Sequence, residues 1–106
     1  MKEIKKDELY SKIVEALKPL KPVKIILFGS YAYGKPNENS DLDICVVERD
    51  YKNKWEEKKK IRKALSFIDL PKDILNPTLE EYEFYKKEPG SVYKDIEEKG
   101  IVLWSS

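Results

Sequence analysis

The sequence predicts a single α+β (mixed α/β) domain, in which a mixed sheet of about four strands carries helices mainly on one face. Four short apolar runs, at residues 23–28, 41–47, 71–75 and 101–104, have the length and residue types of strands. Helical patterns lie between these runs, and strands interleaved with helices form a sheet that helices cover. A chain of 106 residues can bury one modest core and is too short for two. We therefore expect residues 1–106 to form one domain.

Charge is abundant in this chain but nearly balanced. Charged residues make up 39% of the sequence and apolar residues 41%. The 21 basic and 20 acidic side chains give a formal net charge of +1, which provides no general attraction to nucleic acid or to a membrane surface. No general nucleic-acid binding is therefore expected, and any binding of a polyanion has to be local.

Residue usage also limits the chemistry. The chain contains no His, which excludes imidazole bases, Ser-His and Cys-His nucleophile pairs and His-ligated zinc. Its single cysteine, Cys45, has no internal disulfide partner and lies in an apolar run, so we expect a buried, unreactive thiol. The first residues lack the apolar segment of a signal peptide, and no apolar run reaches the roughly 20 residues of a membrane span. These features predict a cytoplasmic protein.

The first two elements are a helix and a central strand. A helical pattern of apolar residues runs from Asp7 to Leu17, with Asp7 as the N-cap, and Pro19 and Pro22 then stop the helix. The next run, Val23 to Phe28, is apolar on both faces except for Lys24, as expected of a strand that is covered on both sides. We therefore place it in the middle of the sheet.

A turn and a second strand follow. The central strand ends at Gly29-Ser30, and Tyr31 to Tyr33 predict a short helix closed by Gly34. We expect the two tyrosines to pack this helix against the sheet rather than to stack on a base. The segment KPNENS, residues 35–40, is rich in turn formers, and DLDICVV resumes as a strand.

The segment from Lys54 to Ile68 predicts an amphipathic helix. Its apolar residues recur at positions i, i+3, i+4 and i+7, whereas the preceding EEKKK is a solvated run. We interpret the segment as a crossover helix that covers the sheet, and nucleic-acid binding by its lysines is the less favoured alternative. The apolar residues are Ile61, Ala64, Leu65 and Ile68.

A third strand and a capped helix come next. Pro71 to Leu75 is a short strand candidate that ends at Asn76-Pro77. Thr78 and Glu81 then form a capping-box pattern, in which each side chain satisfies a backbone donor of the other residue. The side chains expected on the inner face of the helix are Leu79, Tyr82 and Tyr85.

The chain closes with a helix and a strand. Glu88-Pro89-Gly90 breaks the preceding helix, and Ser91 can cap a new one that ends at Gly100. Val92 and Ile96 are expected to face inward in this helix. Ile101 to Trp104 predict the final strand.

The Gly29-Ser30 turn has the features of an anion site. A strand that ends in glycine lets the backbone approach a ligand closely, and Ser30 adds a hydroxyl group. The first amides of the following turn are unpaired donors, which favour phosphate. On its own, however, a Gly-Ser pair is usually an ordinary turn.

Two carboxylates follow this turn. Asp41 and Asp43 are two residues apart on a predicted strand, so both side chains project from the same face, opposite Leu42 and Ile44. Adjacent carboxylates repel each other, and a bridging divalent cation removes that cost. Oxygen ligands without His favour Mg²⁺ or Mn²⁺. Alone, such a pair is more often a solvated strand start.

The combination is more specific than either part. A Gly-Ser pair, ten residues and Asp-x-Asp, framed by apolar strands, arise by chance in roughly one chain of this size per thousand. The stretch GSYAYGKPNENSDLDICVV resembles the signature of the minimal nucleotidyltransferases (MNT) of the DNA polymerase β-like superfamily, which includes the antitoxins of HEPN/MNT toxin–antitoxin pairs. The ending GSVYKDIEEKGIVLW also resembles the close of that family. The resemblance covers the chain from about Asp7 to Trp104.

The resemblance implies a nucleotidyltransferase fold and a role for each matching residue. Gly29 and Ser30 would bind the nucleotide triphosphate, while Asp41 and Asp43 would ligate two Mg²⁺ ions. These four residues are the core of the site that the resemblance implies.

The family also uses a third carboxylate on a later strand, which completes the metal site and helps to activate the attacking hydroxyl. Asp73 opens the KDIL strand and is our choice for this role. Asp69 is the rival, but it precedes Pro71 and is expected in the turn.

One position departs from the family pattern. Family members often read G-S-x-A-R-G, and this chain has Tyr33 where that arginine would stand. More of the triphosphate charge is then left for the metal ions and for Lys35, which we include among the nucleotide-binding residues. Weaker activity or an altered choice of substrate is the expected consequence.

The resemblance also implies a reaction and a partner. ATP would be the substrate, and its AMP group would pass to a hydroxyl while pyrophosphate leaves. A domain of this size has little room for an acceptor-binding lobe, so the acceptor is expected to be a protein surface. The resemblance implies that this acceptor is a tyrosine of a HEPN-domain RNase toxin. Two alternatives stay open: an antitoxin that neutralises a toxin by binding alone, and an adenylyltransferase for a small molecule or nucleic acid that works with a partner subunit.

Overall fold

The computed structural model describes residues 6–34 and 40–106 and confirms a mixed α/β fold with a four-stranded sheet. The central strand β1 is antiparallel to β2 and to β4, whereas β2 and β3 are parallel. β1 therefore lies inside the sheet, as its apolar sequence predicts. The strands are β1 (Lys24–Phe28), β2 (Leu42–Val47), β3 (Lys72–Leu75) and β4 (Ile101–Ser105), in the order β3-β2-β1-β4.

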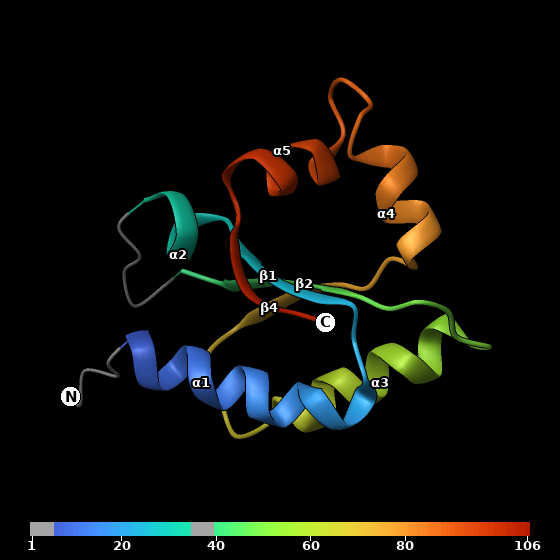
Figure 1. Cartoon of the computed structure of the whole chain (residues 1–106). Coiled ribbons are helices and arrows are strands. Elements are labelled where there is room, and N and C mark those ends of the chain that lie inside the picture. Colours follow the sequence, from blue (N-terminus) through green and yellow to red (C-terminus); the bar gives the residue numbers. More distant parts are fainter. Residues whose placement is uncertain (1–5, 35–39) are drawn as a thin grey trace.

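Helices cover both faces of the sheet. Figure 1 shows α1 and α3 on one side, α4 and α5 on the other, and the short α2 at one end. The expectation that helices lie mainly on one face is therefore wrong. The helical elements are α1 (Lys6–Leu17), the 3₁₀ turn η1 (Lys18–Leu20), α2 (Ser30–Tyr33), α3 (Lys54–Ala64), α4 (Leu79–Tyr85) and α5 (Val92–Lys99).

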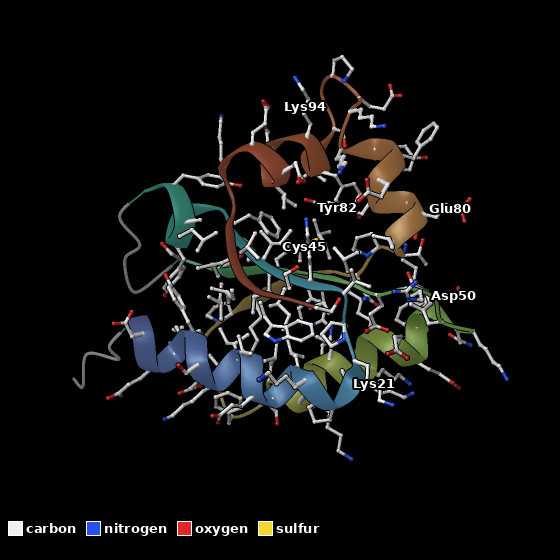
Figure 2. All side chains as sticks on the ribbon, in the orientation of Figure 1. Lys21, Cys45, Asp50, Glu80, Tyr82 and Lys94 are labelled. Carbon is white, nitrogen blue, oxygen red and sulfur yellow. The ribbon has the colours of Figure 1, made fainter. Side chains whose placement is uncertain are left out.

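The alternation of side chains along the strands explains the two helical layers. Ile25 and Leu27 of β1 pack in the cluster that includes α1 and α3, while Ile26 and Phe28 pack with residues of α4 and α5. Cys45 belongs to the second layer and lies between the sheet and these two helices (Figure 2). Burial raises the pKa of its thiol to about 12, so the predicted unreactive cysteine is confirmed.

Local signals set the ends of the helices. Asn53 is the N-cap of α3, and its side-chain oxygen accepts hydrogen bonds from the backbone nitrogens of Trp55 (3.0 Å) and Glu56 (3.2 Å). α3 ends at Ala64, before the predicted end at Ile68, although Ile68 is still buried beyond the helix. An apolar side chain can therefore pack on the core from the turn that follows a helix.

The two C-terminal helices match their predicted caps. The capping box of Thr78 and Glu81 is present at the start of α4, and Ser91 caps α5. Val92 is exposed, however, and Tyr93 packs next to Ile96 in its place. In the described ranges of the chain, no helix has the length and apolar content that crossing a membrane requires.

β2 is followed by a buried carboxyl group that the sequence analysis did not single out. Glu48 is 4% exposed, and its Oε1 has no hydrogen-bond partner among the described residues. Burial, a side-chain hydrogen bond with Glu57 and the charge of Glu57 raise the pKa of Glu48 to about 8, while Asn76 and Lys60 act in the opposite direction. Burial beside Glu57 therefore favours the protonated form of Glu48 in the folded protein, and this preference is lost on unfolding.

We expect this proton to make folding stability depend on pH. Because the folded-state pKa of about 8 lies above the ordinary value of 4.5, the stabilisation is complete below pH 4.5 and is lost as the pH rises through 8. The variant Glu48→Gln keeps the shape of the protonated side chain but cannot titrate. Between about pH 5 and pH 8, the melting temperature of the wild type should fall by at least about 4 °C more than that of the variant. Parallel curves would contradict a buried proton on Glu48.

Candidate active site

Gly29, at the end of β1, lies against the side chain of Asp43 in β2. Gly29 follows the strand with φ of 74°, a left-handed conformation that favours glycine. A Cβ atom at this position would collide with Oδ2 of Asp43. The predicted glycine requirement therefore has two causes, the backbone conformation and the carboxylate that lies against it.

The turn into α2 leaves backbone donors at its start. The nitrogens of Ala32 and Tyr33 donate to the Gly29 oxygen at 3.0 and 2.9 Å. The amides of Ser30 and Tyr31 come before these donors, at the end of the helix where backbone N–H groups have no intrahelical partner. Such amides, together with the Ser30 hydroxyl, can bind the oxygens of a phosphate group.

Strand pairing brings the predicted carboxylates to the same end of the sheet. Asp43 is paired with Asp73 in the parallel register of β2 and β3, and with Phe28 in the antiparallel register of β2 and β1. Asp41 lies just before β2 and is exposed, as is Asp73, whereas Asp43 is half-buried. The rival Asp69 lies in the connection between α3 and β3. Of the two candidates for a third carboxylate, only Asp73 is next to Asp43.

The carboxylates act on one another. Burial, the charge of Asp73 and the charge of Asp41 all raise the pKa of Asp43. No cation contributes to this shift within the described part of the chain. The ionised form of Asp43 is therefore costly, and a cation placed among the three carboxylates would lower that cost.

Oxygen donors of this kind suit Mg²⁺ or Mn²⁺. Over residues 6–34 and 40–106, however, no group of three or more acidic, histidine or cysteine side chains is arranged to hold a metal ion. The carboxylate oxygens suit a divalent cation by their chemistry, but their present arrangement does not yet enclose one. A metal ion would still have to draw the side chains of Asp41 and Asp73 toward Asp43.

Tyr33 is exposed and lies close enough to this site for its charges to act on the phenol group. The side chain is 45% exposed and belongs to neither apolar cluster, whereas Tyr31 packs on the α1–α3 layer. The packing expectation is therefore confirmed for Tyr31 and wrong for Tyr33. Burial and the charges of Asp95 and Asp43 raise the pKa of Tyr33, and a hydrogen bond from the Gly29 backbone opposes them. The tyrosine that replaces the family arginine thus lies within the electrostatic reach of the carboxylates.

Two site residues need separate mention. Lys35, the predicted nucleotide-binding lysine, lies outside the described residues. Asp95 of α5 acts on Tyr33 but was not among the predicted site residues. No local motif marks Asp95, because its position depends on how α5 packs over the sheet.

Comparisons with known proteins agree with this geometry. The family model described as "Nucleotidyltransferase domain" matches residues 9–103. A protein of Methanocaldococcus jannaschii named "Putative protein adenylyltransferase" is 33% identical over 102 residues, which cover 95% of this chain and 92% of that protein.

Solved structures show the same fold. A crystal structure of a toxin–antitoxin with AMP-PNP contains a chain that is 26% identical, with a TM-score of 0.66, over 92% of this chain and 73% of the other. A complex of the tri-AMPylated Shewanella oneidensis HEPN toxin with its MNT antitoxin contains a chain that is 22% identical, with a TM-score of 0.61, over 94% of this chain and 72% of the other. At 22% identity, the second likeness concerns the fold alone.

Proposed function

The chain belongs to the nucleotidyltransferase domain family, and from this premise we propose that it transfers AMP from ATP to a tyrosine hydroxyl of a HEPN-domain toxin. The observation that carries the proposal is the contact between Gly29 and Asp43, with Asp73 beside them. A phosphate-binding turn and the carboxylates needed for the chemistry then meet at one point of the sheet. The similar toxin–antitoxin structure with AMP-PNP supports ATP as the nucleotide.

Binding of the nucleotide is assigned to the start of α2. The Ser30 hydroxyl and the first amides of the turn after Gly29 donate to the triphosphate oxygens. Lys35 follows this turn in sequence and is proposed to neutralise further phosphate charge. These contacts hold the α-phosphorus in place beside the carboxylates.

The transfer step is an in-line displacement at the α-phosphorus. The acceptor oxygen forms a bond to this phosphorus while the bond to the bridging oxygen of the β-phosphate breaks, and pyrophosphate leaves with the electron pair. We assign to Asp73, an exposed carboxylate, the role of accepting the proton of the attacking hydroxyl. Two Mg²⁺ ions, or Mn²⁺, bound by Asp41, Asp43 and Asp73 would neutralise the charge on the attacking and departing oxygens.

The acceptor is proposed from two considerations. Residues 6–34 and 40–106 form one sheet with its two helical layers and show no separate lobe for an acceptor, so we assign the acceptor hydroxyl to another protein. The Shewanella complex pairs an MNT antitoxin with a HEPN toxin that carries AMP groups. A tyrosine of a HEPN toxin meets both conditions.

Neutralisation of the toxin distinguishes catalysis from binding. Cells that produce a HEPN toxin should grow when this chain is co-expressed and should stop growing when it carries Asp41→Asn together with Asp43→Asn. Asp69→Asn is the matched control, because that carboxylate lies in the connection before β3, and it should protect as the wild type does. Equal protection by the double variant would favour neutralisation by occlusion, an alternative that Tyr33 at the family's arginine position keeps open.

A further inference from the structure

The outward face of α3 carries a basic groove that the proposed reaction does not use. The groove has a volume of about 500 Å³, and the indole ring of Trp55 forms part of its lining. Trp55 is 77% exposed, an unusual state for a tryptophan because it leaves a large apolar surface in water. The side chains that line the groove are Lys54, Trp55, Lys58, Lys59 and Arg62.

The cations of this groove form no ion pair with the acidic side chains that the structure describes. Lys54, Lys58 and Arg62 recur at intervals of four residues, so they share one face of the helix. Within the described ranges, no ion pair involves a lining residue, and the pair on this helix joins Lys60 to Glu57 at 3.5 Å. Four basic side chains therefore share this groove with one exposed aromatic ring.

The groove is separate from the candidate active site. Ile61 is buried in the core beneath α3, whereas the lining residues are exposed except for Lys58, which is half-buried at the edge of this face. In Figure 1, the start of α3 lies at the other end of the molecule from α2, where Gly29 and Ser30 are found. A ligand of the groove would thus leave the nucleotide site free.

We infer that this groove binds a single-stranded nucleic acid, with a base stacked on Trp55 and backbone phosphates bound by the surrounding lysines and Arg62. An exposed aromatic ring set among cations is the usual platform for single strands, because every base has a flat face and every phosphate a charge. An acidic protein is the weaker candidate, because three of the four cations are lysines, which are depleted at protein–protein interfaces, although tryptophan and arginine are enriched there. The net charge of +1 restricts such binding to this local surface.

Fluorescence anisotropy with a labelled oligouridylate of about 12 nucleotides tests the inference on the full chain. Trp55→Ala should weaken binding by about ten-fold or more, whereas Trp55→Phe, which keeps a stacking ring, should retain most of it. Lys58→Glu with Lys59→Glu should weaken binding strongly and lower the salt slope of log K by about 1.4. Lys12→Glu with Lys87→Glu, an equal charge change at exposed positions outside the groove, should leave binding nearly unchanged.

Two results would overturn the inference. One is equal binding by the wild type, Trp55→Ala and the Lys58–Lys59 double variant. The other is competition by an oligoglutamate peptide as effective as that by unlabelled oligouridylate, which would indicate an acidic protein partner. Asp43→Asn should bind the oligonucleotide as the wild type does, so this test is independent of the proposed AMP transfer. Melting curves verify that each variant is folded.

Discussion

Replacing Asp43 by Asn should reduce AMP transfer by more than about a thousand-fold without weakening the fold. The carboxylate lies against Gly29 and next to Asp73, so its loss removes a ligand from the centre of the site. Burial and the neighbouring charges raise the pKa of Asp43. Because the ionised form is disfavoured in the folded state, neutral Asn should leave the melting temperature at neutral pH, measured without metal, equal or higher.

Asp69→Asn is the control for this variant, since it removes the same charge from an exposed position away from Asp43. It should keep wild-type transfer. Wild-type rates for Asp43→Asn would contradict the assignment of this residue. A clear fall in its melting temperature would instead show that Asp43 has a structural role.

Gly29→Ala should also abolish transfer, and it should destabilise the protein. The alanine would adopt a left-handed conformation at a cost of about 1–3 kcal/mol, and its Cβ would collide with Oδ2 of Asp43. In a domain of this size, that cost lowers the melting temperature by at least about 4 °C. Thermal unfolding and the transfer rate of the variant measure the two effects.

The chain contains a matched control for the cost of placing alanine in a left-handed backbone conformation. Gly90 has φ of 83°, and no atom of the described residues lies within 4 Å of a Cβ added there. Gly90→Ala should therefore show the conformational cost alone and destabilise less than Gly29→Ala. In the Gly29→Ala background, Asp43→Ala should recover part of the lost stability, because it removes the collision. Equal costs at the two glycines would argue against a contact between Gly29 and Asp43.

The fold could be predicted from the sequence where local signals agree with the tertiary contacts. The apolar run of β1, the capping box at Thr78 and the glycine after α5 mark elements that the structure contains. The distribution of helices over the two faces could not be read in this way. It depends on which side each crossover takes, although the two-sided apolar pattern of β1 was already a sign that both faces are covered.

The candidate site shows the same difference between residues that a local motif marks and contacts that depend on tertiary packing. Gly29, Ser30, Asp41 and Asp43 form a motif within one stretch of sequence, and Asp73 was chosen because it opens a strand. The parallel pairing of β2 and β3 places Asp73 beside Asp43. Tyr33 was noticed as a departure from the motif, but its nearness to the carboxylates, and that of Asp95 to Tyr33, follow from the packing of α2 and α5. Such contacts have no signal in a single sequence.

The central claim is that this chain moves the AMP group of ATP onto a partner tyrosine. The most direct measurement incubates the chain with Mg²⁺, a purified HEPN-domain toxin and ATP that carries a radiolabel on either the α-phosphate or the γ-phosphate. The account predicts that the toxin acquires the α-label and not the γ-label, gains AMP units in mass at a tyrosine, and remains unlabelled with Asp43→Asn. Labelling from the γ-phosphate, or a toxin left unlabelled by the wild type, would contradict it.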